Sequence, residues 1–184
     1  QVVAANDQSI LRGWHMIMNT STGEFRLIAT DAGGSTQQAF VDGPSSVGRI
    51  GICGMSWDGA TLRARSDTGD TDTDSGGGGC FKRSVRDFHI GVRPNDSDRF
   101  LFDYVLLALL GSDAEARSDA QMKTDIATIL DNLRHGRDLR TNLGHTPSFY
   151  FDALDAGSTW ADRVGGLSLD RNGAPELYDF RGAA

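Results

Sequence analysis

Short strand-like segments separated by turn residues constrain the fold of this chain more than any other feature. Residues 24–30 (EFRLIAT) alternate polar and apolar side chains, which is the period-two signature of a half-buried strand. Residues 60–65 repeat the pattern, with Leu62 and Ala64 on one face, after an Asp58-Gly59 pair typical of a hairpin turn. Many short strands with closely spaced turns favour an antiparallel sandwich or barrel.

The same reasoning places the remaining elements along the chain. It predicts strands at 9–18, 24–30, 37–41, 47–57, 60–65, 88–92 and 100–110, with shorter ones at 148–151, 167–169 and 177–180. Residues 66–79 (SDTGDTDTDSGGGG) contain no apolar side chain and end in four glycines, so they are predicted to form a mobile loop.

One amphipathic helix is predicted in the C-terminal half, over 118–135. Ser118 and Gln121 have the spacing of a capping box, and Gly136 stands where a C-terminal cap belongs. Apolar residues then recur at helical spacing from Met122 to Leu133. Since such a helix is marginal alone, it must pack on the sheets. The predicted fold is therefore mostly β, an antiparallel two-sheet jelly-roll sandwich closed by one helix.

The length and net charge of the chain limit the kinds of core and binding partner that it can have. A chain of 184 residues with 39% hydrophobic residues can bury one core. Its net charge of −7 argues against binding a nucleic-acid backbone, and no apolar run is long enough to span a membrane. The chain begins at Gln1 without an initiator methionine, so we expect a processed chain or a piece of a longer one.

Four motifs, in order, resemble those of the concanavalin A-like (laminin-G-like) jelly-roll family. They are Gly13-Trp14 with the 24–27 segment, the 55–63 segment (MSWDGATLR), the 88–94 segment (FHIGVRP) and the 104–115 segment (YVLLALLGSDAE). The likeness covers residues 9 to 135 and implies a jelly roll. The family's usual Y-V-D-G after the central hairpin is missing, which puts a ligand or ion site on that turn in doubt.

The end of the chain departs from the family order. Residues 159–169 (TWADRVGGLSL) resemble what such domains carry at their beginning. We therefore expect a jelly-roll domain over 1–140 and a tail over 141–184 that supplies missing strands. The tail could pair within the chain, as in a circular permutation, or with a neighbouring copy, because an unpaired sheet edge invites a further strand. A separate arm is the remaining alternative.

Catalytic motifs are absent from the sequence. The family's hydrolases carry E-x-D-x-x-E on one strand, whereas the three glutamates here lie far apart. No G-x-S-x-G elbow accompanies the four histidines, and no cysteine–histidine spacing suits zinc. The chain is therefore predicted not to be an enzyme and to need no cofactor, calcium excepted.

Two candidate binding sites remain. Asp70, Asp72 and Asp74 alternate in the predicted loop, where their carboxylates could wrap calcium; a simple solvated acidic loop is the alternative. Trp160, in the tail, is the tryptophan predicted to bind a ligand such as a glycan, because Trp14 and Trp57 occupy strand positions that favour core packing. Whether Cys53 and Cys80 form a disulfide is left open by the sequence.

These observations favour a non-catalytic structural or adhesion module. The strand-completing tail and the lack of a ligand cluster favour assembly with copies of itself or with other virion proteins. We expect a virion (phage) surface protein, such as a capsid decoration or tail-fibre domain, in a virion or extracellular location. The alternative is a carbohydrate-binding, lectin-like module of a larger secreted protein.

Overall fold

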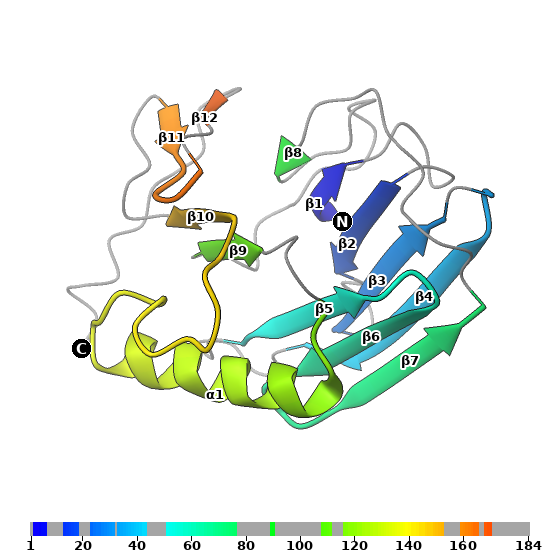
Figure 1. Cartoon of the computed structure of the whole chain (residues 1–184), viewed down its shortest axis with the longest axis horizontal. Helices are drawn as coiled ribbons and strands as arrows, with labels where there is room; N and C mark the ends of the chain where they lie inside the picture. The colour runs from blue at the N-terminus through cyan, green and yellow to red at the C-terminus, as the bar shows by residue number, and fades with distance from the viewer. Residues whose placement is uncertain are drawn as a thin grey trace. The chain divides into compact units, whose positions relative to one another are not determined.

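The computed structural model describes residues 2–6, 13–18, 23–31, 33–43, 51–76, 89–90, 108–111, 116–152, 159–165 and 168–170. The chain divides into two compact units, one made of residues 1–101 and 116–143, the other of residues 102–115 and 144–184. Each unit is built around antiparallel strands (Figure 1).

The first unit contains two sheets and the helix. A five-stranded sheet has the order β4-β3-β2-β1-β8, and a three-stranded sheet has the order β5-β6-β7. The strands of the first are β1 (Val2–Asn6), β2 (Gly13–Met18), β3 (Glu24–Thr30), β4 (Thr36–Asp42) and β8 (His89–Ile90). Those of the second are β5 (Cys53–Trp57), β6 (Thr61–Ser66) and β7 (Thr71–Ser75), and the helix is α1 (Asp119–Arg134).

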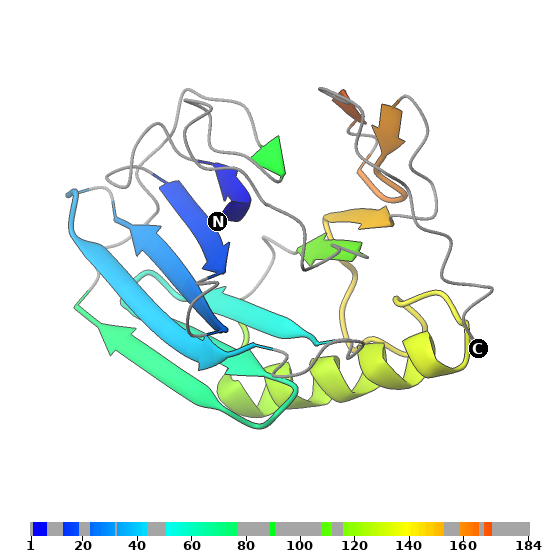
Figure 2. The same cartoon turned by 180° about the vertical axis from the view of Figure 1, so that it is seen from behind.

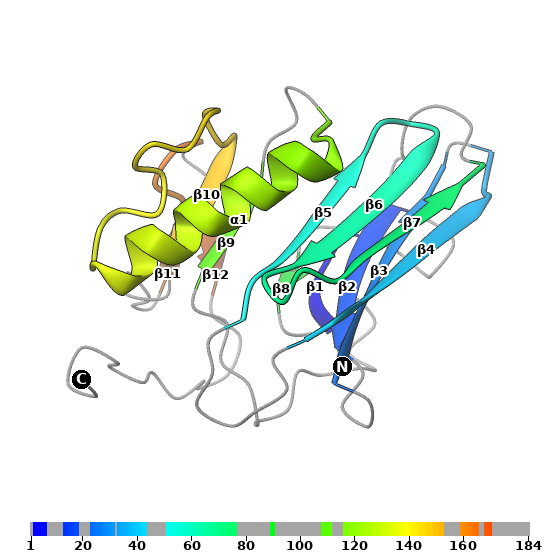
Figure 3. The ribbon, with the colours of Figure 1, turned by 90° about the horizontal axis from the view of Figure 1, so that it is seen from below.

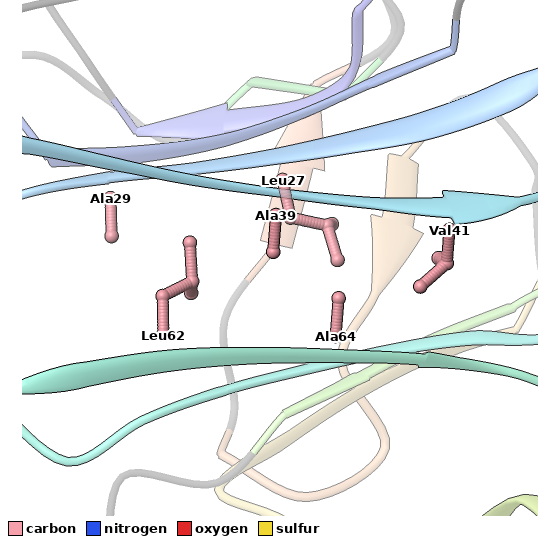
Figure 4. Close-up of a cluster of buried hydrophobic side chains, with 6 residues drawn as sticks. All are labelled: Leu27, Ala29, Ala39, Val41, Leu62 and Ala64. Carbon is pink, nitrogen blue, oxygen red and sulfur yellow. The ribbon is translucent and has the colours of Figure 1, made fainter. Parts of the chain in front are cut away.

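The core lies between the two sheets. Leu27 and Ala29 of β3 and the inward residues of β4 meet Leu62 and Ala64 of β6, and all of these side chains are buried. Figure 4 shows them pointing toward one another between the two layers of strands. Apolar residues on one face of each strand thus build the core, as the alternation predicted. The arrangement is mostly β and antiparallel, consistent with a β-sandwich.

Helix α1 covers the outer face of the three-stranded sheet. Cys53, Met55 and Trp57 pack against the inter-sheet core, so the alternating Gly54 faces outward. A Cβ atom on Gly54 would lie 3.6 Å from Ile126 and 3.8 Å from Met122, the buried apolar residues of the helix. Gly54 therefore lies against the helix, at a distance where even a methyl group would make ordinary van der Waals contact. Figures 2 and 3 show α1 running beside this sheet.

Both ends of the helix follow the prediction. The Ser118 side chain accepts from the backbone N–H of Gln121, and the Gln121 side chain accepts from that of Ser118, which completes the capping box. At the other end Gly136 has φ +61°, and Arg137 N–H donates to the Asn132 carbonyl in a Schellman motif. Helix 118–135 is confirmed, with the two cap residues just outside the hydrogen-bonded turns.

In its described residues, the second unit contains two short strand pairs. Strand β10 (Phe149–Asp152) pairs with β9 (Ala108–Gly111), and β11 (Thr159–Ala161) pairs with β12 (Ser168–Asp170). Whether the tail completes the sheets of its own domain or of a neighbouring copy stays a prediction. The predicted strands at 148–151 and 167–169 are confirmed to within a residue, and β11 is an additional strand. The predicted strand at 177–180 lies outside the described residues.

Several other expectations require correction. The predicted mobile loop at 66–79 is wrong, because residues 71–75 form strand β7. Of the strand predicted at 47–57, β5 covers residues 53–57, residues 51–52 are not in a strand, and residues 47–50 lie outside the described part of the chain. Strand β1 was not predicted at all. The described parts of the strands predicted at 9–18 and 100–110 are 13–18 and 108–110, and strand β9 continues one residue further, to Gly111. No described helix is long and apolar enough to cross a membrane.

Candidate functional site

The three aspartates predicted to bind calcium lie on one face of strand β7 and the residue before it. In the register of the sheet, Asp72 is opposite Ala64 and Asp74 is opposite Leu62 of β6. Since cross-strand partners share a face, these carboxylates project toward the inner side of the three-stranded sheet. We call Asp70, Asp72 and Asp74 the aspartate row.

Each member of the aspartate row accepts a hydrogen bond from the backbone of β4. The N–H groups of Gln38 and Asp42 donate to Asp74 Oδ2 and Asp70 Oδ2 over 2.8 Å, and that of Phe40 donates to Asp72 Oδ2 over 2.9 Å. Strand β4 is the last strand of its sheet, so these N–H groups point away from β3. The row thus joins the edges of the two sheets through side chains.

This geometry gives the calcium prediction no support. The three acceptor oxygens bind N–H groups that are two residues apart along β4. Because a strand rises about 3.4 Å per residue, neighbouring acceptor oxygens are separated by roughly 7 Å. Oxygens that share one calcium ion lie within about 5 Å of each other, because each is 2.3–2.6 Å from the metal. Among the described residues no group of three or more histidine, cysteine, aspartate or glutamate side chains could hold a metal ion. The extended strand holds the three carboxylates apart, whereas the predicted loop could have brought them together around one ion.

Aspartates elsewhere serve the backbone in the same way. The short side chain of aspartate brings its carboxylate within reach of neighbouring N–H groups. Eight described aspartate side chains accept a backbone N–H: Asp31, Asp58, Asp67, Asp70, Asp72, Asp74, Asp138 and Asp162.

Asp58 shows the electrostatic effect of such contacts. Its Oδ1 accepts from the N–H groups of Ala60 (2.9 Å) and Thr61 (2.8 Å) in the β5–β6 hairpin, and Arg63 lies 2.7 Å from its other oxygen. These donors favour the ionised form, the two backbone N–H groups most, and lower the pKa of Asp58 to about 2. The carboxylate therefore stays charged and closes the hairpin.

Ion pairs attach the helix to its sheet. Arg117 Nε lies 2.9 Å from Asp125 Oδ2 and Nη2 lies 3.0 Å from Oδ1, in a two-pronged pair that is mostly buried. The Arg117 N–H also donates to Ser56 Oγ over 2.7 Å, so the segment before the helix is tied to β5. Arg65 of β6 pairs with Asp119 in the first helical turn over 2.9 Å. These charged side chains therefore hold the helix against the three-stranded sheet.

Cys53 is a free cysteine at the margin of the inter-sheet core. Burial raises the pKa of its thiol to about 12, and the nearby Asp67 carboxylate adds to the effect. The thiol is therefore neutral and a poor nucleophile near pH 7. Its possible partner, Cys80, lies outside the described residues.

The predicted ligand residue Trp160 lies in β11, where its backbone pairs with Leu169 of β12. The next but one residue, Asp162, is buried and organises this region. Its carboxylate accepts from the N–H groups of Tyr150, Val164 and Gly165 over 2.7–2.9 Å. The aspartate therefore holds β10 to the turn that follows β11. The ligand role of Trp160 stays a prediction.

An exposed aromatic group on the outer face of β4 was not predicted. Phe40 is 43% exposed, the guanidinium of Arg26 lies 5.5 Å from its ring centre, and Arg26 donates to Gln38 Oε1. Phe40 follows the buried Ala39 in a strand that alternates inward and outward. That alternation was visible in the sequence and could have marked Phe40 as outward-facing, in contrast to Trp57, which packs against the core as expected.

Comparison of the chain with protein-family models, with curated proteins and with solved structures found no match. The resemblance to the concanavalin A-like family therefore rests on the sequence motifs alone.

Proposed function

We propose that this chain is a non-catalytic structural or adhesion module with a jelly-roll type of sandwich, acting on the surface of a virion or in another extracellular assembly. A capsid decoration or tail-fibre domain is the specific form we favour, and this part of the proposal is an analogy at the level of the fold.

The observation that supports it is the use of the carboxylates. Catalysis by a carboxylate pair requires side chains free to meet a substrate across a cleft. Here the aspartate row, Asp58 and Asp162 bind backbone N–H groups, and Asp119 and Asp125 pair with arginines. An acidic chain whose charges hold strands and helix together suits a rigid building block.

The experiment is a measurement of mass in solution. Size-exclusion chromatography with light scattering on the whole chain should give a stable trimer or higher oligomer across a dilution series. A monomer that binds no sugar would contradict both the assembly proposal and its alternative below.

The alternative is a carbohydrate-binding module, and the group around Phe40 favours it. Sugar sites combine an exposed aromatic ring with planar polar side chains, and Arg26 and Gln38 flank this ring. Glycan-array binding should then be lost in Phe40→Ala, with Thr73→Ala on the exposed face of β7 as a matched surface control. Trp160→Ala tests the tail site in the same assay. Binding that survives both aromatic substitutions, or no binding by the parent, contradicts this alternative.

A further inference from the structure

Arg26 differs from the other half-buried arginines that the structure describes. Its guanidinium donates to Gln38 Oε1. Within the described part of the chain its buried Nε has no hydrogen-bond acceptor, and no carboxylate lies at ion-pair distance from it. A half-buried charge without an opposite charge bears a desolvation cost that nothing offsets. The other four half-buried arginines each pair with an aspartate: Arg63, Arg65, Arg117 and Arg140.

Arg26 lies on the outer face of the five-stranded sheet, since it alternates with the core residue Leu27. In the register of β3, Phe40 of β4 lies opposite it on one side and Ile17 of β2 on the other. The next outward residue of β3, Ile28, is buried. The charge therefore lies at the margin of an apolar surface, where an ionic contact is stronger than in open water.

The groups around Arg26 favour a carboxylate as the missing partner. A guanidinium is a planar fork that binds a carboxylate through two parallel hydrogen bonds. Because Gln38 Oε1 accepts from Arg26, the amide nitrogen of Gln38 is left to donate to a ligand. The Phe40 ring, 43% exposed, offers an apolar surface to the C–H groups of a sugar ring. Together these groups suit a sugar that bears a carboxylate.

The acidic end of the same face gives such a ligand one orientation. Asp42 follows Phe40 by two residues on β4 and lies opposite Glu24 of β3. Two residues of strand span roughly 7 Å, so this end lies close enough to repel a carboxylate held at Arg26. The hydroxyl groups of the sugar are donors that can face it.

We propose that Arg26, Gln38 and Phe40 bind an acidic sugar, a uronic or sialic acid. Its carboxylate would take the place that an aspartate occupies beside the other half-buried arginines. This inference rests on the carbohydrate-binding alternative given above and names its substrate class. The assembly proposal does not depend on it.

The test compares carboxylated glycans with neutral counterparts. Trigalacturonate and its methyl ester differ only in the charge of the carboxyl groups, and sialyllactose differs from lactose by one sialic acid. In calorimetric titrations of the whole chain, an acidic probe should bind at least about ten times tighter than its neutral counterpart. Arg26→Gln should bring this ratio to about one. The matched control Arg134→Gln removes an exposed charge at the end of α1 and should keep the parent's ratio.

Equal binding of acidic and neutral probes by the parent would overturn the inference, as would a preference for acids that persists in folded Arg26→Gln. Neutral glycans bound through Phe40 with no preference for acids overturn this assignment and leave the carbohydrate-binding alternative standing. A parent that binds no glycan overturns both. If Arg26→Gln loses its native circular dichroism, Arg26→Lys carries the test, because lysine keeps the charge without the fork. An unchanged ratio in Arg26→Lys then refutes the inference.

Discussion

Truncation of Leu62 to alanine tests the two-sheet core most directly. Leu62 is fully buried in β6, and it faces Leu27 and Ala29 of β3 and Ala39 of β4 across the gap between the sheets. The side chains around Leu62 come from the five-stranded sheet as well as from its own sheet. The cost of Leu62→Ala therefore reports how well the two sheets pack.

The magnitude follows from the atoms removed and the neighbours that remain. The substitution deletes three carbons, worth about 2.4 kcal/mol at roughly 0.8 kcal/mol per buried methylene. The alanines around the site, Ala29, Ala39 and Ala64, are too short to fill the space, so a cavity adds about 1 kcal/mol or more. We expect a loss of about 3–4 kcal/mol in the free energy of unfolding, a large part of the usual total.

Equilibrium unfolding in urea, with an unchanged slope, is the assay. Leu62→Ile, which keeps the volume, should cost less than about 1.5 kcal/mol. Leu27→Ala combined with Leu62→Ala should cost less than the sum, because both line the same space. A loss below about 1 kcal/mol for Leu62→Ala would refute the reasoning, since a side chain at a solvated surface gives values of that size.

Three further predictions concern charges and backbone geometry. Asp125→Ala should lower the free energy of unfolding in urea by about 2–3 kcal/mol, because it leaves the mostly buried Arg117 charge without this partner. Asp125→Leu combined with Arg117→Met should recover most of that loss, and equal losses in both variants would contradict the prediction. Asp58 has its pKa lowered to about 2 in the folded chain, so its contribution is present above about pH 4 and disappears as the pH falls toward 2. The melting temperatures of the parent and Asp58→Asn should therefore differ at pH 6 and converge near pH 2, and a constant difference would refute it. Gly136→Ala forces a side chain to φ +61° and should cost about 1 kcal/mol in the same urea assay, whereas an unchanged or higher stability would be inconsistent with the left-handed cap.

Elements whose signals are local could be predicted from the amino-acid sequence. The alternation in β3 and β6 sets which side chains face the core, the Asp58-Gly59 pair sets the hairpin, and Ser118 with Gln121 starts the helix. These features depend on residues within a few positions of one another. Local chemistry is enough to specify them, and so their bounds were close to those of the structure.

Strand β7 depends on contacts that form only in the folded chain. Its sequence, TDTDS, has no apolar residue and indicates a solvated loop when taken alone. The alternation of threonine and aspartate was a period-two signal, but nothing local tells which neighbour would accept inward carboxylates. Only when β4 presents its outward N–H groups beside β7 are those charges satisfied, and a strand becomes stable. The same holds for β9 and β10, which are separated along the chain and form a ladder only when the fold brings them together.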